Sequence, residues 1–373
     1  MVSFLKKIIR WRNILGAISV IACISLLLSY LSPFIHPITI KIIPLFGLAY
    51  PFILLSNILL FIFWLIVKSK WSWIIGIIII IGGKLHFRVF SFGAGDKNEE
   101  AIELSIMSYN VRLFDRYDSD RTKSYITKDK IFNFLRKNST DVICFQEFYQ
   151  QDLPTNFVTK DSLIPLLNTF DYHERYAHRM AGRQNFGVAI YSKLPIIEKG
   201  TINFNSQSSQ FNFCIYSDIV KEQDTFRVYN VHLQSIRFGK EDYALFEEST
   251  LHVKEKQHRI LQLLSKVTKA YPVRAEQTQL VLEHIKKSPF PVIVCGDFND
   301  TPMSYTYNRF YSSMVDAYKN TTTGIGSTYI GKMPIGRIDY IFHSSELGSN
   351  QFAIQQEELS DHRAIQCHVF KKI

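Results

Sequence analysis

Polar side chains close several of the buried strands that the sequence predicts. The clearest case is residues 291–302, PVIVCGDFNDTP, where an apolar run ends in Asp297 and, two residues later, Asn299. Similar polar residues at or beside strand ends are Asn110, Glu147, His232, Asp339, Asp361 and His362. Each alone is also typical of a turn or a helix cap. A carboxylate inside an apolar strand, as at Asp339, must however be paired or coordinated, so we expect these residues to form one site.

These residue types suit the hydrolysis of a phosphate ester. The side-chain oxygens of Asn and Glu are hard ligands that suit Mg²⁺. An Asp-x-Asn pair can orient a water for attack in line with the leaving group. A histidine backed by a carboxylate can act as an acid or stabilise charge on the phosphorus. Little other chemistry is expected to use all of these groups together.

The elements that would position these residues alternate between strands and helices from residue 102 onward. Apolar or alternating runs predict strands over 102–109, 141–145, 187–192, 212–220, 226–233, 292–295, 337–343 and 364–370. Amphipathic runs predict helices over 129–137, 255–270 and 273–287, with a break at Pro272 between the last two. Many strands with helices between them favour an α/β or α+β sandwich.

The first third of the chain has the composition of a membrane anchor. Two long runs, roughly 13–32 and 43–67, contain no charged residues. Lys41 lies just before the second run. Each is long enough to cross a hydrocarbon core about 30 Å thick. A third run, 71–88, is shorter and ends among Lys84, His86 and Arg88, so two spans remain an alternative to three. We therefore expect a membrane anchor over 1–90, a polar linker over 91–100 and a catalytic domain over 101–373.

Most of the net positive charge lies in the first 100 residues. Residues 1–100 contain 10 Lys and Arg against 3 Asp and Glu, whereas residues 101–373 contain 33 and 30. The second part is thus too balanced for net charge alone to indicate nucleic-acid binding. Six basic residues lie on the N-terminal side of the expected three-span topology and three on the other side, which favours an N-terminus inside and a catalytic domain outside.

The five cysteines lie in apolar runs, without C-x-x-C spacing. This pattern predicts buried free thiols rather than disulfides or a metal site.

The motifs taken together resemble the endonuclease/exonuclease/phosphatase superfamily. The resemblance runs in order through SYNVRLF, CFQEF, FGVAIYSKLPI, YNVHLQS, VIVCGDFNDTP, GRIDYIF and LSDHRA, between residues 102 and 370. It implies a four-layer sandwich of two packed mixed β-sheets flanked by helices, with the site at one edge. The three-span N-terminus looks most like a membrane-anchored bacterial branch, which implies a multi-pass inner-membrane protein with its catalytic domain on the periplasmic side.

The resemblance also implies a role for each site residue. Asn110 and Glu147 look like the metal-binding pair, with Asp361 binding or lying near the metal, which would be Mg²⁺ or Mn²⁺. His232 resembles the histidine that contacts the phosphate and protonates the leaving group. Asp297 would orient or deprotonate the water, Asn299 would hold the water and the phosphate, and Asp339 would pair with His362. These assignments imply a working enzyme.

Residues that contact the substrate are harder to assign. Arg179 and Arg183 lie in a loop before one of the motifs, and Arg274 begins a helix near the expected site, so all three are candidate phosphate contacts. The insertion 235–272 carries a run of basic residues that is either a solvated helix face or a basic lid facing phosphates or anionic headgroups.

Three functions remain open at this stage. The first is a metal-dependent nuclease held at the membrane, and the second is a phosphodiesterase or phosphatase acting on phospholipid headgroups or small phosphoesters. The third is a non-catalytic membrane scaffold that kept the fold, which the complete residue set disfavours. The sequence allows no inference about a protein partner.

Overall fold

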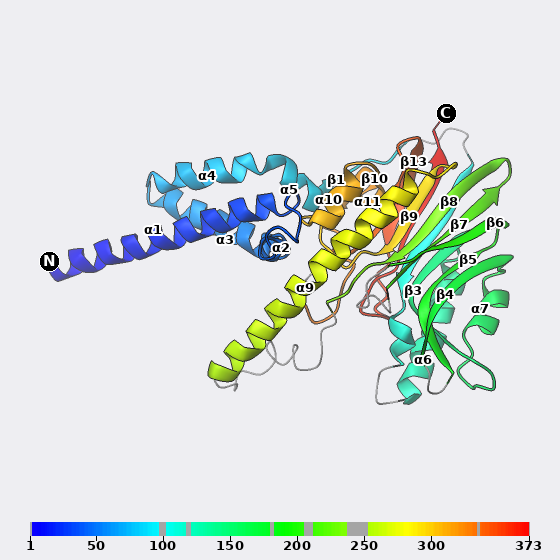
Figure 1. Cartoon of the computed structure of the whole chain (residues 1–373). Helices are drawn as coiled ribbons and strands as arrows, with labels where there is room; N and C mark the ends of the chain where they lie inside the picture. The colour runs from blue at the N-terminus through cyan, green and yellow to red at the C-terminus, as the bar shows by residue number, and fades with distance from the viewer. Residues whose placement is uncertain are drawn as a thin grey trace.

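The computed structural model describes residues 2–96, 102–116, 121–179, 183–204, 212–236, 253–333 and 336–372. Figure 1 shows an arm of helices that projects from a β-sandwich. The arm contains five helices, namely α1 (Val2–Leu31), α2 (Ile43–Leu48), α3 (Tyr50–Ile66), α4 (Trp71–Ile81) and α5 (Gly83–Val89). The sandwich begins after a short strand, β1 (Ser91–Phe92), which pairs with β11 (Thr323–Gly324).

Two six-stranded sheets form the sandwich. One has the order β13 (Leu347–Ile354), β14 (Ile365–Lys371), β2 (Glu103–Asn110), β3 (Val142–Gln151), β5 (Gln184–Ser192) and β4 (Asp171–Arg179). The other has the order β10 (Val315–Asp316), β12 (Asp339–His343), β9 (Val292–Asp297), β8 (Asp224–His232), β7 (Phe213–Lys221) and β6 (Ile196–Ile202). The pairs β2–β3 and β8–β9 are parallel and the other neighbours are antiparallel, so both sheets are mixed.

Alternation along the strands explains why the sheets pack face to face. Leu104 and Ile106 of β2 and Ile293 and Cys295 of β9 point into one apolar cluster between the sheets. Residues of the opposite parity, such as Met107 of β2, face outward and pack under helices. The helices that accompany the sheets are α6 (Arg121–Lys137), α7 (Lys160–Leu166), α9 (Val253–Ile285), α10 (Tyr305–Tyr311) and α11 (Ala317–Thr321). The expected sandwich of two mixed sheets flanked by helices is confirmed (Figure 1).

The helical arm is more broken than the sequence predicts. Only Trp11–Leu31 of α1 is by itself long and apolar enough to cross a membrane, among the residues described. The predicted second span divides at Ala49 into α2 and α3, because Pro51 opens α3 and cannot continue the preceding helix. The predicted third span bends by 62° between α4 and α5 at Gly82. The three-span topology and its orientation stay predictions.

Helix α9 is a single helix where the sequence predicts two. It runs without interruption through Pro272, where the sequence predicts a break between two helices. Proline removes one backbone hydrogen bond there. Ala270 and Tyr271 before the proline and Ala275 after it are all buried, so packing overrides the local signal.

All five cysteines are buried and free, as predicted.

Several contacts fasten the arm to the sandwich. Met303, in the loop after β9, packs in a cluster with the arm residues Leu26, Tyr50 and Val89. The Lys319 ammonium donates to the backbone carbonyl of Phe87. The expected linker 91–100 is therefore anchored at its start, through β1, rather than being a free tether.

Candidate active site

Neighbouring strands place three predicted site residues at one level of a sheet. Asp297 ends β9 and is paired in register with His232 of parallel β8 and with Asp339 of antiparallel β12. Adjacent strands lie about 4.8 Å apart and paired residues point to the same face. In β9 that face also carries Ile293 and Cys295, which belong to the core between the sheets. The three polar side chains therefore face the second sheet at the rim of the core.

The second sheet supplies Asn110 and Glu147. Asn110 ends β2, and its Nδ2 donates a 3.0 Å hydrogen bond across the sandwich to Asp297 Oδ2. Glu147 lies in a bulge of β3 between Phe145 and Phe148, with a φ of 47°. Bulges commonly re-aim a side chain next to an active site. Here Glu147 Oε1 lies 4.0 Å from His232 Nε2.

A buried polar bridge fixes the two sheets beneath these residues. Gln146 Nε2 donates to Asn230 Oδ1 at 2.7 Å, and Asn230 Nδ2 donates to the carbonyls of Phe145 and Ala189. Gln146 precedes Glu147, and Asn230 lies two residues before His232. Because satisfied buried networks have few alternative arrangements, this bridge holds the two halves of the site in register.

Histidine 362 completes the cluster from the loop before β14. Its Nδ1 lies 3.0 Å from both carboxylate oxygens of Asp339, and its Nε2 lies 3.8 Å from Asp297 Oδ2. The predicted pairing of Asp339 with His362 is present in this geometry. Burial alone would lower the pKa of His362, but the carboxylates of Asp339 and Asp297 outweigh it and hold that pKa well above its ordinary value.

Asn299 lies at the mouth of this cluster with a φ of 53°. Its backbone N–H donates to Asp297 Oδ1 at 2.8 Å, and its Nδ2 donates to Asp297 Oδ2 and to the Leu233 carbonyl, each at 3.1 Å. The carboxamide therefore joins the end of β9 to the end of β8.

The carboxylates at this rim repel one another. Burial, and after it the carboxylate of Asp361, raises the pKa of Glu147 to about 7. Burial also raises the pKa of Asp297, with Asp339 acting in the same direction. Convergent carboxylates of this kind are relieved by a divalent cation, and the oxygens of Asn110, Glu147 and Asp361 are the hard ligands that Mg²⁺ or Mn²⁺ prefers. The residues present thus fit such an ion.

A second set of side chains, Asp297, Asp339 and His362, is close enough together to bind a metal ion. One ligand atom each from Asp297, Asp339 and His362 lies within 4.8 Å of the others, and all three residues are buried. The Nδ1 of His362 is already paired with Asp339, however, and its Nε2 faces Asp297. This arrangement is an acid–histidine–acid chain, which suits proton handling better than binding of an oxygen-preferring ion.

Residues 107–362 match the family model described as the endonuclease/exonuclease/phosphatase family. The chain belongs to this family. A second model, of a domain of unknown function, matches residues 12–89, and no curated protein matches the chain significantly.

Solved structures with the same fold include two described as endonuclease/exonuclease/phosphatase proteins. One from Bacteroides thetaiotaomicron is 18% identical, with a TM-score of 0.53, and the match covers 74% of this chain and all of that one. One from Beutenbergia cavernae is 13% identical, with a TM-score of 0.53 and 72% of each chain covered. A protein of unknown function from Enterococcus faecalis is 16% identical, with a TM-score of 0.51, covering 72% of this chain and all of that one. At these identities the likeness concerns the fold.

Membership of the endonuclease/exonuclease/phosphatase family makes the protein a phosphoesterase or nuclease-like hydrolase. Enzymes of this family generally use divalent metals, which agrees with the convergence of carboxylates at the rim.

The predicted substrate contacts have different outcomes. The side chain of Arg179 lies outside the described residues. Arg183 is exposed, and its Nη1 donates to the Leu153 carbonyl at 2.8 Å. Arg274 is fully buried, and its Nη1 lies 3.0 Å from Asp300 Oδ2. A side chain without exposed surface cannot meet a substrate, so the geometry does not support the prediction for Arg274.

Arg274 instead holds two backbone segments that carry site residues. Its Nε donates to the Gln234 carbonyl at 3.0 Å, and Gln277 Oε1 accepts from the Gln234 backbone N–H at 2.8 Å. Gln234 follows β8, whereas Asp300 follows Asn299. Arg274 therefore ties together the two segments that carry His232 and Asn299.

Arg112 is a site residue that sequence reasoning missed. Arg112 to Asp115 all have positive φ values, from 46° to 56°, a conformation that non-glycine residues rarely adopt in succession. The turn places Arg112 Nε 3.5 Å from Asp361 Oδ2, and half of the Arg112 side chain is exposed. An arginine two residues after Asn110 was the only available signal. Strain and exposed positive charge together make it a candidate functional position.

Proposed function

We propose that the protein is a membrane-anchored, divalent-metal-dependent phosphodiester hydrolase that acts by in-line attack of a water. The observation that carries this proposal is the convergence of Asn110, Glu147, His232, Asp297 and the Asp339–His362 pair at one rim of the sandwich. These residues come from both sheets and are far apart in sequence. A scaffold without chemistry would gain nothing from burying so many ionisable groups together.

Asp297 and Asn299 are proposed to handle the attacking water. Asp297 receives the water's proton while the water oxygen bonds to phosphorus, and its raised pKa supports this role as a base. The Asn299 carboxamide, held by Asp297 and the Leu233 carbonyl, orients the water and a phosphate oxygen. The rigid strand β9 supports the tight positioning that in-line attack requires.

Two histidines are proposed to meet the phosphate. His232 is buried at the end of β8, 3.8 Å from Asp297 Oδ2, and would protonate the leaving oxygen. His362, kept cationic by Asp339, would stabilise negative charge on the phosphorus centre. Asn110, Glu147 and Asp361 are the residues proposed to hold Mg²⁺ or Mn²⁺. When bound, such an ion neutralises charge on the phosphate oxygens.

The full chain in lipid nanodiscs, incubated with Mg²⁺ and supercoiled plasmid, tests the nuclease form of this proposal. We expect nicking that requires Mg²⁺ and that falls by about 10²- to 10⁴-fold in Asp297→Asn, the usual contribution of a positioned base. Equal activity of the two proteins would point to a contaminant or a non-catalytic scaffold. Binding of Mg²⁺ without nicking would move the proposal to the second candidate.

That second candidate is hydrolysis of phospholipid headgroups or small phosphoesters. It is favoured by Met303, which lies four residues after Asn299 and packs among residues of the helical arm. This contact ties the rim of the site to the part of the chain proposed to enter the membrane. Release of water-soluble phosphate compounds from phospholipid vesicles, dependent on Mg²⁺ and on Asp297, would select this candidate over the nuclease.

The membrane topology is also part of the proposal. The apolar helix Trp11–Leu31 supports at least one crossing. With three crossings, the excess of basic residues on the N-terminal side favours a catalytic domain on the periplasmic side of the inner membrane. Protease digestion of intact spheroplasts, read with an antibody to the C-terminus, should remove the catalytic domain. Protection of that domain would reverse the orientation.

A further inference from the structure

The two halves of α9 have different surroundings. The C-terminal half packs Val281 and Leu282 into the cluster on the outer face of the β9 sheet. In the N-terminal half, Ile260, Leu261 and Leu264 are exposed by 41%, 65% and 38%. Figure 1 shows the N-terminal end of α9 extending away from the sheets, toward the side of the molecule where the helical arm lies.

The exposed apolar residues lie on one face of the helix. Positions 260 and 261 are four and three residues before position 264, which places all three on one face of an α-helix. Residues 253–269 contain five Lys and Arg but a single acidic residue, Glu255. Lys256 and Lys269 are exposed and, by helical spacing, border the apolar face on its two sides. An apolar stripe bordered by lysines is the pattern of a helix that lies in a membrane interface.

The position of α9 agrees with a membrane partner. Its body contacts α2, the first helix after α1 along the chain. Helix α1 contains the segment apolar enough to cross a bilayer. The helix that carries this apolar face therefore contacts the arm just after that segment, near where a membrane surface would lie if α1 crosses the bilayer.

We infer that the N-terminal half of α9 docks on an anionic lipid surface, with Ile260, Leu261 and Leu264 at the boundary between headgroups and acyl chains. The lysines beside them would face anionic headgroups, which attract such residues. This inference rests on the proposed insertion of α1 and adds a second, peripheral attachment.

Docking at this helix has a consequence for the site. Arg274 and Gln277, further along α9, hold Gln234 next to His232. A rigid helix with one end on the membrane and its middle against the site fixes the height of the active-site rim above the bilayer. The substrate that this arrangement favours is a phosphoester presented at the membrane surface.

Single-cysteine labelling of the full chain tests the inference, because the five native cysteines are all buried and should react slowly. A fluorophore is attached at Leu261→Cys, at Glu283→Cys, an exposed position in the packed C-terminal half of α9, and at Ile21→Cys on the exposed surface of α1. Each protein is placed in nanodiscs at one chain per disc, with phosphatidylcholine alone or mixed with phosphatidylglycerol. Neutral acrylamide serves as the aqueous quencher.

We expect quenching at position 261 to be several-fold weaker than at position 283, and weaker still when phosphatidylglycerol is present. Lys256→Gln with Lys269→Gln should remove the effect of phosphatidylglycerol while leaving position 21 shielded. Equal quenching at 261 and 283, with position 21 shielded, overturns the docking of α9 but leaves the insertion of α1 intact. Full quenching at position 21 overturns both.

Two further outcomes would also overturn the assignment. Shielding at position 261 that is identical in the two lipid mixtures would exclude an anionic surface as the partner. Shielding that appears only with two chains per disc would assign the apolar face to a second copy of the protein. None of these readouts involves substrate, so they are independent of the proposed hydrolysis.

Discussion

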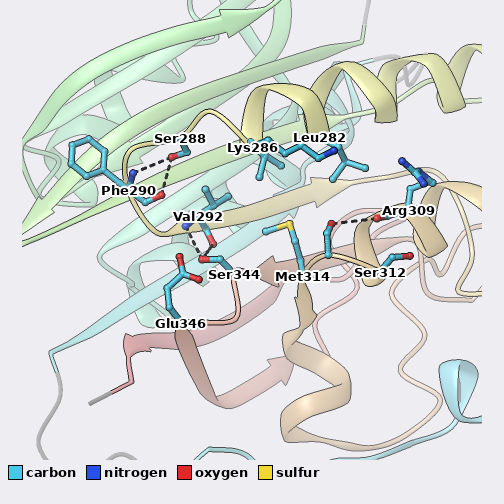
Figure 2. Close-up of a pocket in the computed structure, with 12 residues that line it drawn as sticks. Leu282, Lys286, Ser288, Phe290, Val292, Arg309, Ser312, Met314, Ser344 and Glu346 are labelled. Atoms are coloured by element: carbon cyan, nitrogen blue, oxygen red, sulfur yellow. Dashed lines mark hydrogen bonds between the residues drawn. The ribbon is translucent and has the colours of Figure 1, made fainter.

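The two ends of strand β9 make an informative comparison. Its C-terminal end delivers Asp297, buried and bonded to Asn110 and Asn299. Its N-terminal end, at Val292, borders a hollow of about 310 Å³ that also opens between α9 and α10. Figure 2 shows this second end, with Lys286, Arg309 and Glu346 around it and Ser344 bonded to the backbone of Val292.

The two ends differ in the burial and pKa values of their charged groups, and this difference tells more about function than the volume of the hollow does. Lys286, Arg309 and Glu346 are exposed, and the hydroxyls of Ser288 and Ser344 hydrogen-bond to backbone groups of Phe290 and Val292. At the other end, buried carboxylates shift one another's pKa values, and Glu147 and Asn299 hold positive φ values. Perturbed groups and backbone strain indicate function better than volume does. We therefore expect substitutions at the two ends of β9 to differ sharply in effect.

The largest effect should follow Asp339→Asn. An asparagine in place of the carboxylate would no longer hold His362 cationic, and it could impose the wrong tautomer on Nδ1. Orienting carboxylates of this kind contribute up to about 10⁴-fold to turnover. We expect kcat to fall by about 10²- to 10⁴-fold with little change in Mg²⁺ affinity, measured by single-turnover kinetics and calorimetry.

Glu346→Gln is the matched control, because it makes the same chemical change at the exposed end of the sandwich. Its kcat should equal that of the unmodified protein. If Asp339→Asn and Glu346→Gln were equally active, the acid–histidine–acid chain would have no catalytic role.

The next effect concerns the support beneath the site. Arg274→Met would leave Asp300 buried without its partner, which typically costs about 3–5 kcal/mol of unfolding free energy. We expect a large fall in the midpoint of urea unfolding, together with lower kcat in the fraction that remains folded. Arg274→Met combined with Asp300→Asn should recover most of the stability but not the kcat.

Arg227, which pairs with Asp218 at 2.6 Å, is the control for this change. Arg227→Met should also lower the unfolding midpoint, but kcat per folded molecule should stay unchanged, because this pair lies toward the far end of β8. A loss of kcat in both variants would mean that stability alone, and not positioning, explains the effect of Arg274.

Several of the predicted site residues, such as Asn110, His232 and Asp297, lie at strand ends, and the structure brings these ends to one rim of the sandwich. A polar residue at the end of an apolar run is visible without a structure, as at Asp297, and parallel neighbours bring such ends to one rim. The two-sheet fold was predictable for the same reason, since strand patterns with period two extend through the domain.

Features that depend on packing between elements were not predictable. The bulge at Glu147 and the left-handed turn at Arg112 have no local sequence signal. The bridge from Gln146 to Asn230 joins residues 84 positions apart. Pro272 looked like a break because its lost hydrogen bond is local information, whereas the burial of Tyr271 and Ala275 that keeps α9 continuous is not.

A smaller and more specific effect is expected for Glu147→Gln. The raised pKa of Glu147, about 7 against an ordinary 4.5, means that folding disfavours its charge. This penalty is absent below about pH 4.5, grows between the two values and is fully present above pH 7. The neutral side chain should therefore raise the melting temperature of the metal-free protein at pH 8.

The same variant should weaken Mg²⁺ binding by about 10- to 100-fold, the size seen when supporting groups of a metal site are removed. The rise in melting temperature on adding Mg²⁺ should shrink accordingly. Calorimetric titration and thermal scans with and without Mg²⁺ measure both quantities. An unchanged Mg²⁺ affinity would remove Glu147 from the ligand set and favour the cluster of Asp297, Asp339 and His362 instead.

The smallest effect is expected at the opposite end of β9. Lys286→Gln and Arg309→Gln remove the two cations beside the hollow, both of them exposed. Exposed substitutions of this kind usually change unfolding free energy by at most about 0.5 kcal/mol, and neither residue lies at the rim that carries Asp297. We expect kcat, Mg²⁺ affinity and urea midpoint to stay within error of the unmodified protein. A loss of activity here, without a loss of stability, would show that a second functional surface exists at this end, and that shifted pKa values and strain do not by themselves locate function in this fold.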